Sequence, residues 1–190
     1  GADGTSAEDL TRAHINCRRQ IEKVVEFLKK YIPGYEECFL ISSAPMIGVR
    51  ETRHFEAEYS LTEEDIKEGK IFPDWVVAKA HYPFDVHNLT GKGWLDKSVK
   101  ETFDKGPPPE GYTIPYRCFV PKTIDRLLLA GRAISGTHVA HSSFRVMSIC
   151  ANMGQAAGIA AALCTANGVA PRDLDVKKIQ DALIKQGVEP

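Results

Sequence analysis

Apolar residues at helical spacing open the chain. They follow Ser6-Ala-Glu-Asp9, a helix start with acidic residues in its first turn, and continue to Leu28 before Pro33-Gly34 ends the pattern. The pattern predicts one long amphipathic helix of roughly six or seven turns, by the 3.6-residue period. Its charged residues are typical of a solvated face rather than of a site.

Two strands are expected next, and strict alternation of apolar and polar residues marks the end of the second one. Phe39–Ser43 is expected to form one strand and Val49–Leu61 another, with an apolar residue at every second position near its end. Continuing the apolar face backwards by twos reaches Arg53 and then Glu51. Two interpretations stay open: a partly buried ion pair, or an arginine that lines a pocket for an anionic substrate, because a guanidinium can bind a carboxylate through two hydrogen bonds.

The middle of the chain is divided into short elements. Thr62 is expected to begin a short helix, and extended segments are expected at Pro73–Ala80, Tyr82–Leu89 and Tyr112–Val120. Three prolines in Asp104–Gly111 exclude a helix and predict an exposed loop.

Asp85 and His87 lie two residues apart on one of these extended segments and therefore share a face. An aspartate that orients a histidine is a common acid–base arrangement. A purely structural pair is the alternative.

The last third of the chain is organised around the stretch from Ile124 to Gly168. A short apolar run, Leu127–Ala130, predicts a strand buried on both faces, and after a polar segment a helix is expected from about Arg145 to Asn167. Small residues recur along this helix at spacings of three and four and so share one face: Ala151, Gly154, Gly158, Ala161 and Thr165. Because glycine costs about 1 kcal/mol relative to alanine inside a helix, this face is expected to press against another backbone as the helix crosses a sheet.

The N-terminus of that helix is the first candidate site. Unpaired N–H groups and the positive end of the helix dipole lie near Ser142 to Ser148, and Arg145 adds a full charge. The place favours an anion or an electron-rich carbonyl. A last helix is expected behind Asp175, with four apolar residues turned inward: Val176, Ile179, Leu183 and Ile184.

Composition narrows the class of protein. The chain has 190 residues, of which 43% are hydrophobic and 26% charged, and a net charge of −1 without a basic block. Nucleic acid and membranes are therefore poor partners, and polar residues interrupt the uncharged run after Val146, so no membrane span is expected. Five cysteines without a CxxC indicate reduced thiols. No basic-then-apolar leader opens the sequence, so a cytoplasmic location is expected, and the first residue, glycine rather than methionine, suits a processed or excised piece.

Several catalytic motifs are absent from the sequence. His138-Val-Ala-His141 lacks a third and fourth ligand at sensible spacing, so no metal site is expected. Neither a GxSxG nor a GxxxxGK[ST] motif occurs. Hydrolase and nucleotide-triphosphatase functions therefore lack support.

Four later runs together carry a family resemblance, and they read IPYRCFVPK, IDRLLLAGRAIS, HVAHSSFRVM and GQAAGIAAAL. With IGVRETR and YSLTEED upstream, they resemble the C-terminal end of the FAD-dependent oxidoreductases related to the flavoprotein subunits of fumarate reductase and succinate dehydrogenase. The resemblance implies that the strand before Gly131-Arg132 rejoins the cofactor-binding sheet and that the next helix points its N-terminus at the flavin ring. The implied cofactor-binding residues are Gly131, Arg132, Arg145, Val146 and Met147. The implied catalytic residues, which would hold or protonate a small polar substrate, are Arg50, Arg53, His87 and His138.

One absence shapes the functional prediction. A dinucleotide flavin site begins with a strand, a GxGxxG turn and a helix, and this sequence has no GxGxxG. We therefore expect a mixed α/β fold that is the C-terminal portion of a Rossmann-like FAD-dependent oxidoreductase, with residues 1–111 as a substrate-side segment and 112–190 closing the FAD-binding domain. The expected partners are a small-molecule substrate and the N-terminal FAD-binding half of the same protein, with a homo-oligomer left open. FAD is expected in the full-length protein and not in this chain alone. The alternative is a non-catalytic ligand-binding or interaction domain derived from such an enzyme.

Overall fold

A computed structural model describes residues 2–87 and 106–189, which form two compact units, Gly1–Arg53 and His54–Pro190. The chain divides into these units after Arg53, whereas the sequence suggested a boundary between residues 111 and 112. Strands from either side of that suggested boundary pair with each other, which keeps residues 54–190 together. The predicted extended segment Tyr82–Leu89 and the predicted loop Asp104–Gly111 each lie partly outside the described residues.

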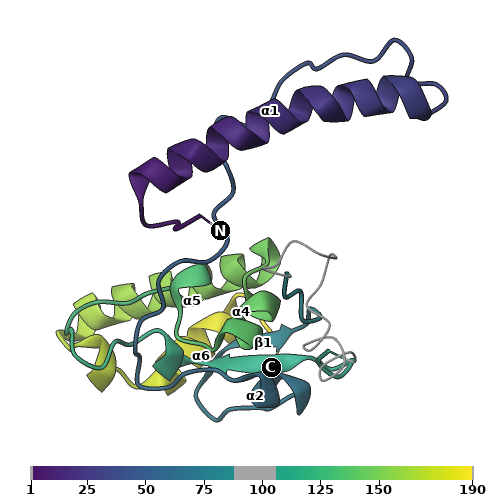
Figure 1. The fold of residues 1–190 in the computed structure, drawn as a ribbon. Helices are drawn as coiled ribbons and strands as arrows, with labels where there is room; N and C mark the ends of the chain where they lie inside the picture. Colours follow the sequence, from purple (N-terminus) through teal and green to yellow (C-terminus); the bar gives the residue numbers. More distant parts are fainter. Residues whose placement is uncertain (1, 88–105, 190) are drawn as a thin grey trace. The chain divides into compact units, whose positions relative to one another are not determined.

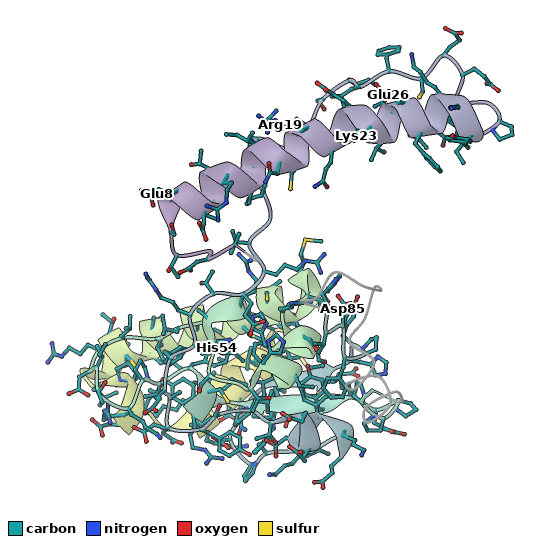
Figure 2. All side chains as sticks on the ribbon, viewed as in Figure 1. Glu8, Arg19, Lys23, Glu26, His54 and Asp85 are labelled. Carbon is teal, nitrogen blue, oxygen red and sulfur yellow. The ribbon has the colours of Figure 1, made fainter. Side chains whose placement is uncertain are left out.

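The first unit is a long helix followed by an extended return segment (Figure 1). Helix α1, Ala7–Tyr31, has 25 residues. Ser6 is its N-cap, as the sequence predicts, and the Ser6 hydroxyl oxygen accepts a hydrogen bond from the Asp9 N–H. Arg18 donates to Ser43 Oγ (2.9 Å) and to the Ala44 carbonyl (3.3 Å), so the return segment runs back beside the helix. No residue of α1 is buried, and Figure 2 labels exposed charged side chains along it, among them Arg19 and Lys23.

The strand predicted at Phe39–Ser43 is wrong. This stretch is extended but forms no ladder, and Phe39 and Ile41 are 76% and 88% exposed. A lone extended segment leaves its backbone groups to water, so a short apolar run alone does not make a strand.

A two-stranded antiparallel sheet lies at the centre of the second unit. Strand β1, Trp75–Ala80, pairs with β2, Tyr112–Pro115, with Trp75 opposite Pro115 and Ala80 opposite Tyr112. Helices α5, Met147–Asn167, and α6, Val176–Lys185, lie against β1, while α2, Glu63–Lys67, contacts β2 and α4, His138–Phe144 (Figure 1). The described part of the unit also contains short 3-10 turns at Tyr116–Cys118, Gly131–Ala133 and Pro171–Asp173. The largest fully buried side chains include Tyr112, Phe119, Phe144, Ile66, Ile114 and Met153.

Helix boundaries in this unit follow local signals. Thr62 caps α2 with a complete capping box, and Asp175 caps α6, as predicted. Gly168 ends α5 with φ +66, a left-handed conformation that glycine adopts without a Cβ clash. Ile184, which was expected to face inward on α6, is 45% exposed instead.

The alternation predicted before Leu61 is confirmed as a burial pattern, although no regular strand forms. Ala57 and Leu61 are buried and Phe55 and Tyr59 half-buried, while the intervening residues are exposed. Isolated bridges join Ala57 to Pro121 and Leu61 to Gly136. The extended segment is therefore held by two different neighbours rather than by one ladder.

The buried strand predicted at Leu127–Ala130 is wrong in this chain. The segment is extended and only partly covered, with Leu127 36% exposed, and Leu129 N–H donates to the Phe119 carbonyl at 3.0 Å. Within the described residues the sheet consists of β1 and β2, so this apolar run has no strand beside it. The polar turn expected after it also differs, because α4 occupies residues 138–144.

Helix α5 buries a different face from the predicted one. Its buried residues, spaced by three and four, are Ile149, Met153, Ala156, Ala160 and Cys164. The small residues lie on the other side: Ala151, Gly154, Gly158, Ala161 and Thr165 are all exposed. A Cβ built on Gly154 or Gly158 meets no atom within 4 Å, so the close contact expected there is absent from the described residues. The buried face carries Ile149 and Met153, which bury more apolar area than the glycines of the opposite face when α5 packs against β1 and α6.

Gly154→Ala and Gly158→Ala are each expected to stabilise this chain by about 1 kcal/mol, because alanine is the better helix former and has open space at both positions. Chemical denaturation of each variant measures the effect. Gly168→Ala is the matched control at the end of the same helix, where φ +66 strains alanine, and it should destabilise by about 1 kcal/mol. Destabilisation at Gly154 would show that this face is covered in solution.

Length and composition alone would also let α5 cross a membrane, and it is the one such helix among the described residues. The same properties suit a helix inside a soluble domain. Its contacts with β1 and α6 favour the second role.

Candidate functional site

The junction of α4 and α5 is built around Arg145. Its backbone N–H donates to the His141 carbonyl at 3.1 Å and ends α4, while Val146 has the extended backbone of an N-cap and begins α5. The chain therefore changes direction between these two residues. The long cationic side chain of Arg145 extends from this junction.

The Arg145 guanidinium binds Asp85. It donates to the Asp85 carbonyl oxygen at 2.7 Å and lies 3.4 Å from Asp85 Oδ2. The Arg145 side chain is only 11% exposed, and a cation so deeply placed needs hydrogen-bond acceptors. One backbone oxygen and one carboxylate supply them.

His87 extends this group. Its Nε2 lies 3.1 Å from Asp85 Oδ2, which confirms that the two residues share a face. The His87 and Asp85 side chains are 35% and 29% exposed, so both reach solvent at the edge of the second unit (Figure 2 labels Asp85). The three residues form a row, which we call the Arg145–Asp85–His87 row.

A buried pair of hydroxyls fixes the segment that carries this row. Ser143 Oγ donates to the Tyr82 carbonyl at 2.7 Å, and Tyr112 Oη lies 3.0 Å from Ser143 Oγ. Burial raises the pKa of Tyr112, so its phenol stays protonated and donates to Ser143. Strand β2 and helix α4 thus hold the chain just before Asp85.

The start of α5 gathers most of the predicted cofactor-binding residues. Val146 provides no side-chain cap, so the first N–H groups of α5 are not bonded by a capping side chain, and Met147 is 90% exposed. Gly131 has φ +67, and a Cβ built on it would lie 3.9 Å from Cys150 in the first turns of the helix. Burial raises the pKa of the Cys150 thiol, and the Arg132 charge opposes the shift, which places Arg132 near the same end.

The chemistry of these donors fits an electron-rich carbonyl edge such as that of a flavin ring. Main-chain N–H groups, the positive end of a 21-residue helix and the Arg132 cation all favour partial negative charge there. Arg145 differs from its prediction in one respect, because its charge is shared with Asp85. The sequence has no GxGxxG, the turn that holds the pyrophosphate of a dinucleotide.

The four predicted catalytic residues fall in both units. Arg50 and Arg53 are exposed residues at the end of the first unit, whereas His87 and His138 belong to the second, where His138 is the exposed first residue of α4. Their grouping around one substrate stays a prediction. Arg53 is exposed and Glu51 half-buried, so the interpretation of a partly buried ion pair at these positions is wrong for Arg53.

Two features of the site escaped sequence analysis. Asp85 was considered only as a partner of His87, because nothing local connects it with Arg145, 60 residues away. His141, 1% exposed, lies between the rings of His54 and Phe144, and His54 Nδ1 lies 3.0 Å from the Gly136 carbonyl (Figure 2 labels His54). Only the tertiary contacts of α4 identify that histidine as buried. In the part of the chain that the structure describes, no cluster of three His, Cys, Asp or Glu residues could hold a metal ion.

The comparison with protein families agrees with the resemblance in the sequence. Residues 1–183 match the family described as FAD dependent oxidoreductase, so the chain belongs to that family. Membership assigns it a flavin-linked redox function and FAD as the cofactor of the family. No significant match is found among curated proteins or among solved structures.

Proposed function

We propose that this chain is the C-terminal portion of an FAD-dependent oxidoreductase that transfers a hydride between flavin N5 and a small polar substrate, one that carries a carboxylate. The enzyme is related in this proposal to the flavoproteins of fumarate reductase and succinate dehydrogenase and acts in the cytoplasm. Its N-terminal half would supply the Rossmann-like GxGxxG turn that this sequence lacks.

The observation that supports the proposal is that this chain exposes two surfaces of the kind that another part of the protein would cover. The apolar run Leu127–Ala130 has no neighbouring strand among the described residues, and the glycine-rich side of α5 is exposed. Glycines in a helix interior weaken it unless a backbone approaches closely. An N-terminal half that added its sheet to this run and to that helix side would explain both features.

In this proposal, each of the candidate site residues has a separate role. FAD, when bound, accepts or gives the hydride. The α5 N-terminus, Gly131, Arg132 and Met147 hold the ring edge, and Arg145 adds positive charge nearby. Arg50 and Arg53 bind the substrate carboxylate, while His87 or His138 moves a proton.

Arg145→Ala tests the flavin site. In the FAD-loaded protein with both halves present, the variant is expected to bind FAD more weakly or to have a lower flavin reduction potential, because a nearby cation favours the anionic reduced flavin. Flavin content and redox titration measure the two effects. Arg172→Ala is a matched control, since Arg172 also makes several ion pairs and carbonyl bonds, with Glu58, Asp125 and Pro121, but none to the row. Equal flavin content and potential in Arg145→Ala and the unmodified protein would reject Arg145 as a flavin neighbour.

A non-catalytic binding domain of the same fold is the second candidate. The exposed and uncapped end of α5 favours it to the extent that such an end binds an anion without redox chemistry. The gene separates the two: a GxGxxG in frame upstream supports the enzyme, and its absence supports the binding domain.

A further inference from the structure

The described residues of the first unit form no core. None of residues 2–53 is buried, although the unit contains the 25-residue helix α1 with apolar residues along one side. Three large apolar side chains of α1 are more than half exposed: Val24 (54%), Phe27 (53%) and Tyr31 (59%). Burial of apolar surface is what offsets the conformational entropy that folding costs. An apolar face left exposed along a helix of this length therefore indicates a contact surface.

This exposed face of α1 follows a seven-residue repeat. Its members recur at alternating spacings of three and four, which is the a and d pattern of a coiled coil. Position a is occupied by Leu10, Cys17, Val24 and Tyr31, and position d by Ala13, Gln20 and Phe27. The return segment lies on the flank at position e, where Met46 and Val49 line a cavity with His14. The other flank, position g, is mostly exposed.

The g flank carries charges that are self-complementary. Position g is occupied by Asp9, Asn16, Lys23 and Lys30. When two such helices lie antiparallel, their g residues face one another, and a single register sets Asp9 opposite Lys30 of the second copy. Asp9 already accepts from Arg12 (2.5 Å), and its carboxylate keeps lone pairs for a further donor. In a parallel pair the g residues face e residues instead, so Lys23 would meet an apolar side chain.

The same register matches the core positions, because the layers of an antiparallel pair join a residues to d residues. The layers are Leu10 with Phe27, Cys17 with Gln20 and Val24 with Ala13, each residue facing its counterpart in the second copy. The polar side chain of Gln20 in the central layer favours one register over its alternatives. The acidic first turn of each helix also lies beside the basic last turn of the other.

We propose that a second copy of this chain covers this face of α1 as an antiparallel helix pair with two-fold symmetry. Every contact of the register then occurs twice, once from each copy, as an isologous interface requires. The pairing involves the first unit and is independent of the proposed flavin site.

Sedimentation equilibrium of the 190-residue chain tests this surface. The unmodified chain should be dimeric in the micromolar range, and Phe27→Asp, which sets a charge into an apolar layer, should weaken the dimer at least about thirty-fold. Ile71→Asp is the matched control, because Ile71 is 78% exposed and lies outside the first unit, and it should leave the dimer unchanged. Circular dichroism checks that both variants keep their helix content.

Two results of this measurement would overturn the proposal: a monomeric unmodified chain, or a dimer that Phe27→Asp leaves intact. If the chain were monomeric and Phe27→Asp blocked assembly with the N-terminal half, the face would belong to that half instead.

Charge reversal tests the register. Lys30→Glu and Asp9→Lys should each weaken the dimer, and the double variant should recover most of the affinity, because the facing pair is restored with its signs exchanged. Interaction with the helix dipole cannot give this recovery, since both substitutions are unfavourable to α1 and their effects would add. A double variant that binds no more tightly than the single variants would overturn the register.

Disulfide trapping tests the direction of the two helices. In a chain with Cys17→Ser, Ala13→Cys and Val24→Cys, oxidation should join position 13 of one copy to position 24 of the other, because these positions share a layer. Mass spectrometry of the linked peptides identifies the positions. Links from 13 to 13 or from 24 to 24, or the absence of a link from 13 to 24, would overturn the antiparallel pair.

Discussion

FAD added to the purified 190-residue chain is expected to remain free in solution. FAD in such enzymes is held chiefly through its ADP half, by a glycine-rich turn and an acidic ribose partner, and the sequence has no GxGxxG. The residues gathered at the α5 N-terminus reach only the ring end. Since about 1.4 kcal/mol corresponds to one decade of affinity, loss of most contacts of a drug-sized ligand should lower affinity by many orders of magnitude.

Flavin fluorescence and absorbance during titration with FAD measure this directly. Tight stoichiometric binding to the chain alone would show that a second half is unnecessary and would refute the proposal of a C-terminal portion. Addition or co-expression of the N-terminal half should restore a yellow, flavin-loaded protein.

Gly154→Leu provides a matched control for that reconstitution. The variant should fold as a separate chain, because a Cβ at residue 154 meets no atom within 4 Å. It should fail to assemble with the N-terminal half if that half covers the same side of α5, since a leucine would then occupy space meant for a backbone. Normal reconstitution would show that this side of α5 is not the interface.

Asp65→Asn is expected to lower the unfolding free energy of the second unit by about 3 kcal/mol at neutral pH. The Asp65 carboxylate is 5% exposed and accepts from Lys70 Nζ (2.6 Å), Tyr59 Oη (2.7 Å) and Thr62 N–H (3.1 Å). The asparagine side chain has one oxygen and one NH2 group. Its NH2 group would therefore face at least one of these three donors, and that hydrogen bond would be lost. Thermal or denaturant unfolding measures the loss.

The effect of Asp65 depends on pH in a defined direction. Burial by itself raises the pKa of Asp65, but the bonds from Lys70, Tyr59 and Thr62 outweigh it and hold the pKa below its ordinary value. The contribution of Asp65 is therefore fully present above its unfolded-state pKa of about 3.9 and is lost as the pH falls through the lower folded-state value. The gap in unfolding free energy between Asp65→Asn and the unmodified chain should close below about pH 4.

Glu64→Gln is the control for this pH dependence, because Glu64 is exposed in the same first turn of α2. It should change stability by less than about 0.5 kcal/mol. If the difference in unfolding free energy between Asp65→Asn and the unmodified chain stayed constant down to about pH 2, Asp65 would not be the source of this pH dependence.

Local chemistry accounts for the elements that sequence analysis predicted well. Ser6, Thr62 and Asp175 begin helices and Gly168 ends one, because a cap is satisfied by backbone groups a few residues away. The pairing of Asp85 with His87 is also local, since alternate residues of an extended segment share a face.

The sequence by itself determined these boundaries and the family to which the chain belongs. The tertiary structure decided what depends on distant partners. Whether Leu127–Ala130 forms a strand depends on a neighbour to pair with, and the side that α5 buries depends on which side chains find β1 and α6. The bond between Arg145 and Asp85 joins residues 60 positions apart, and no periodicity encodes a contact over that separation.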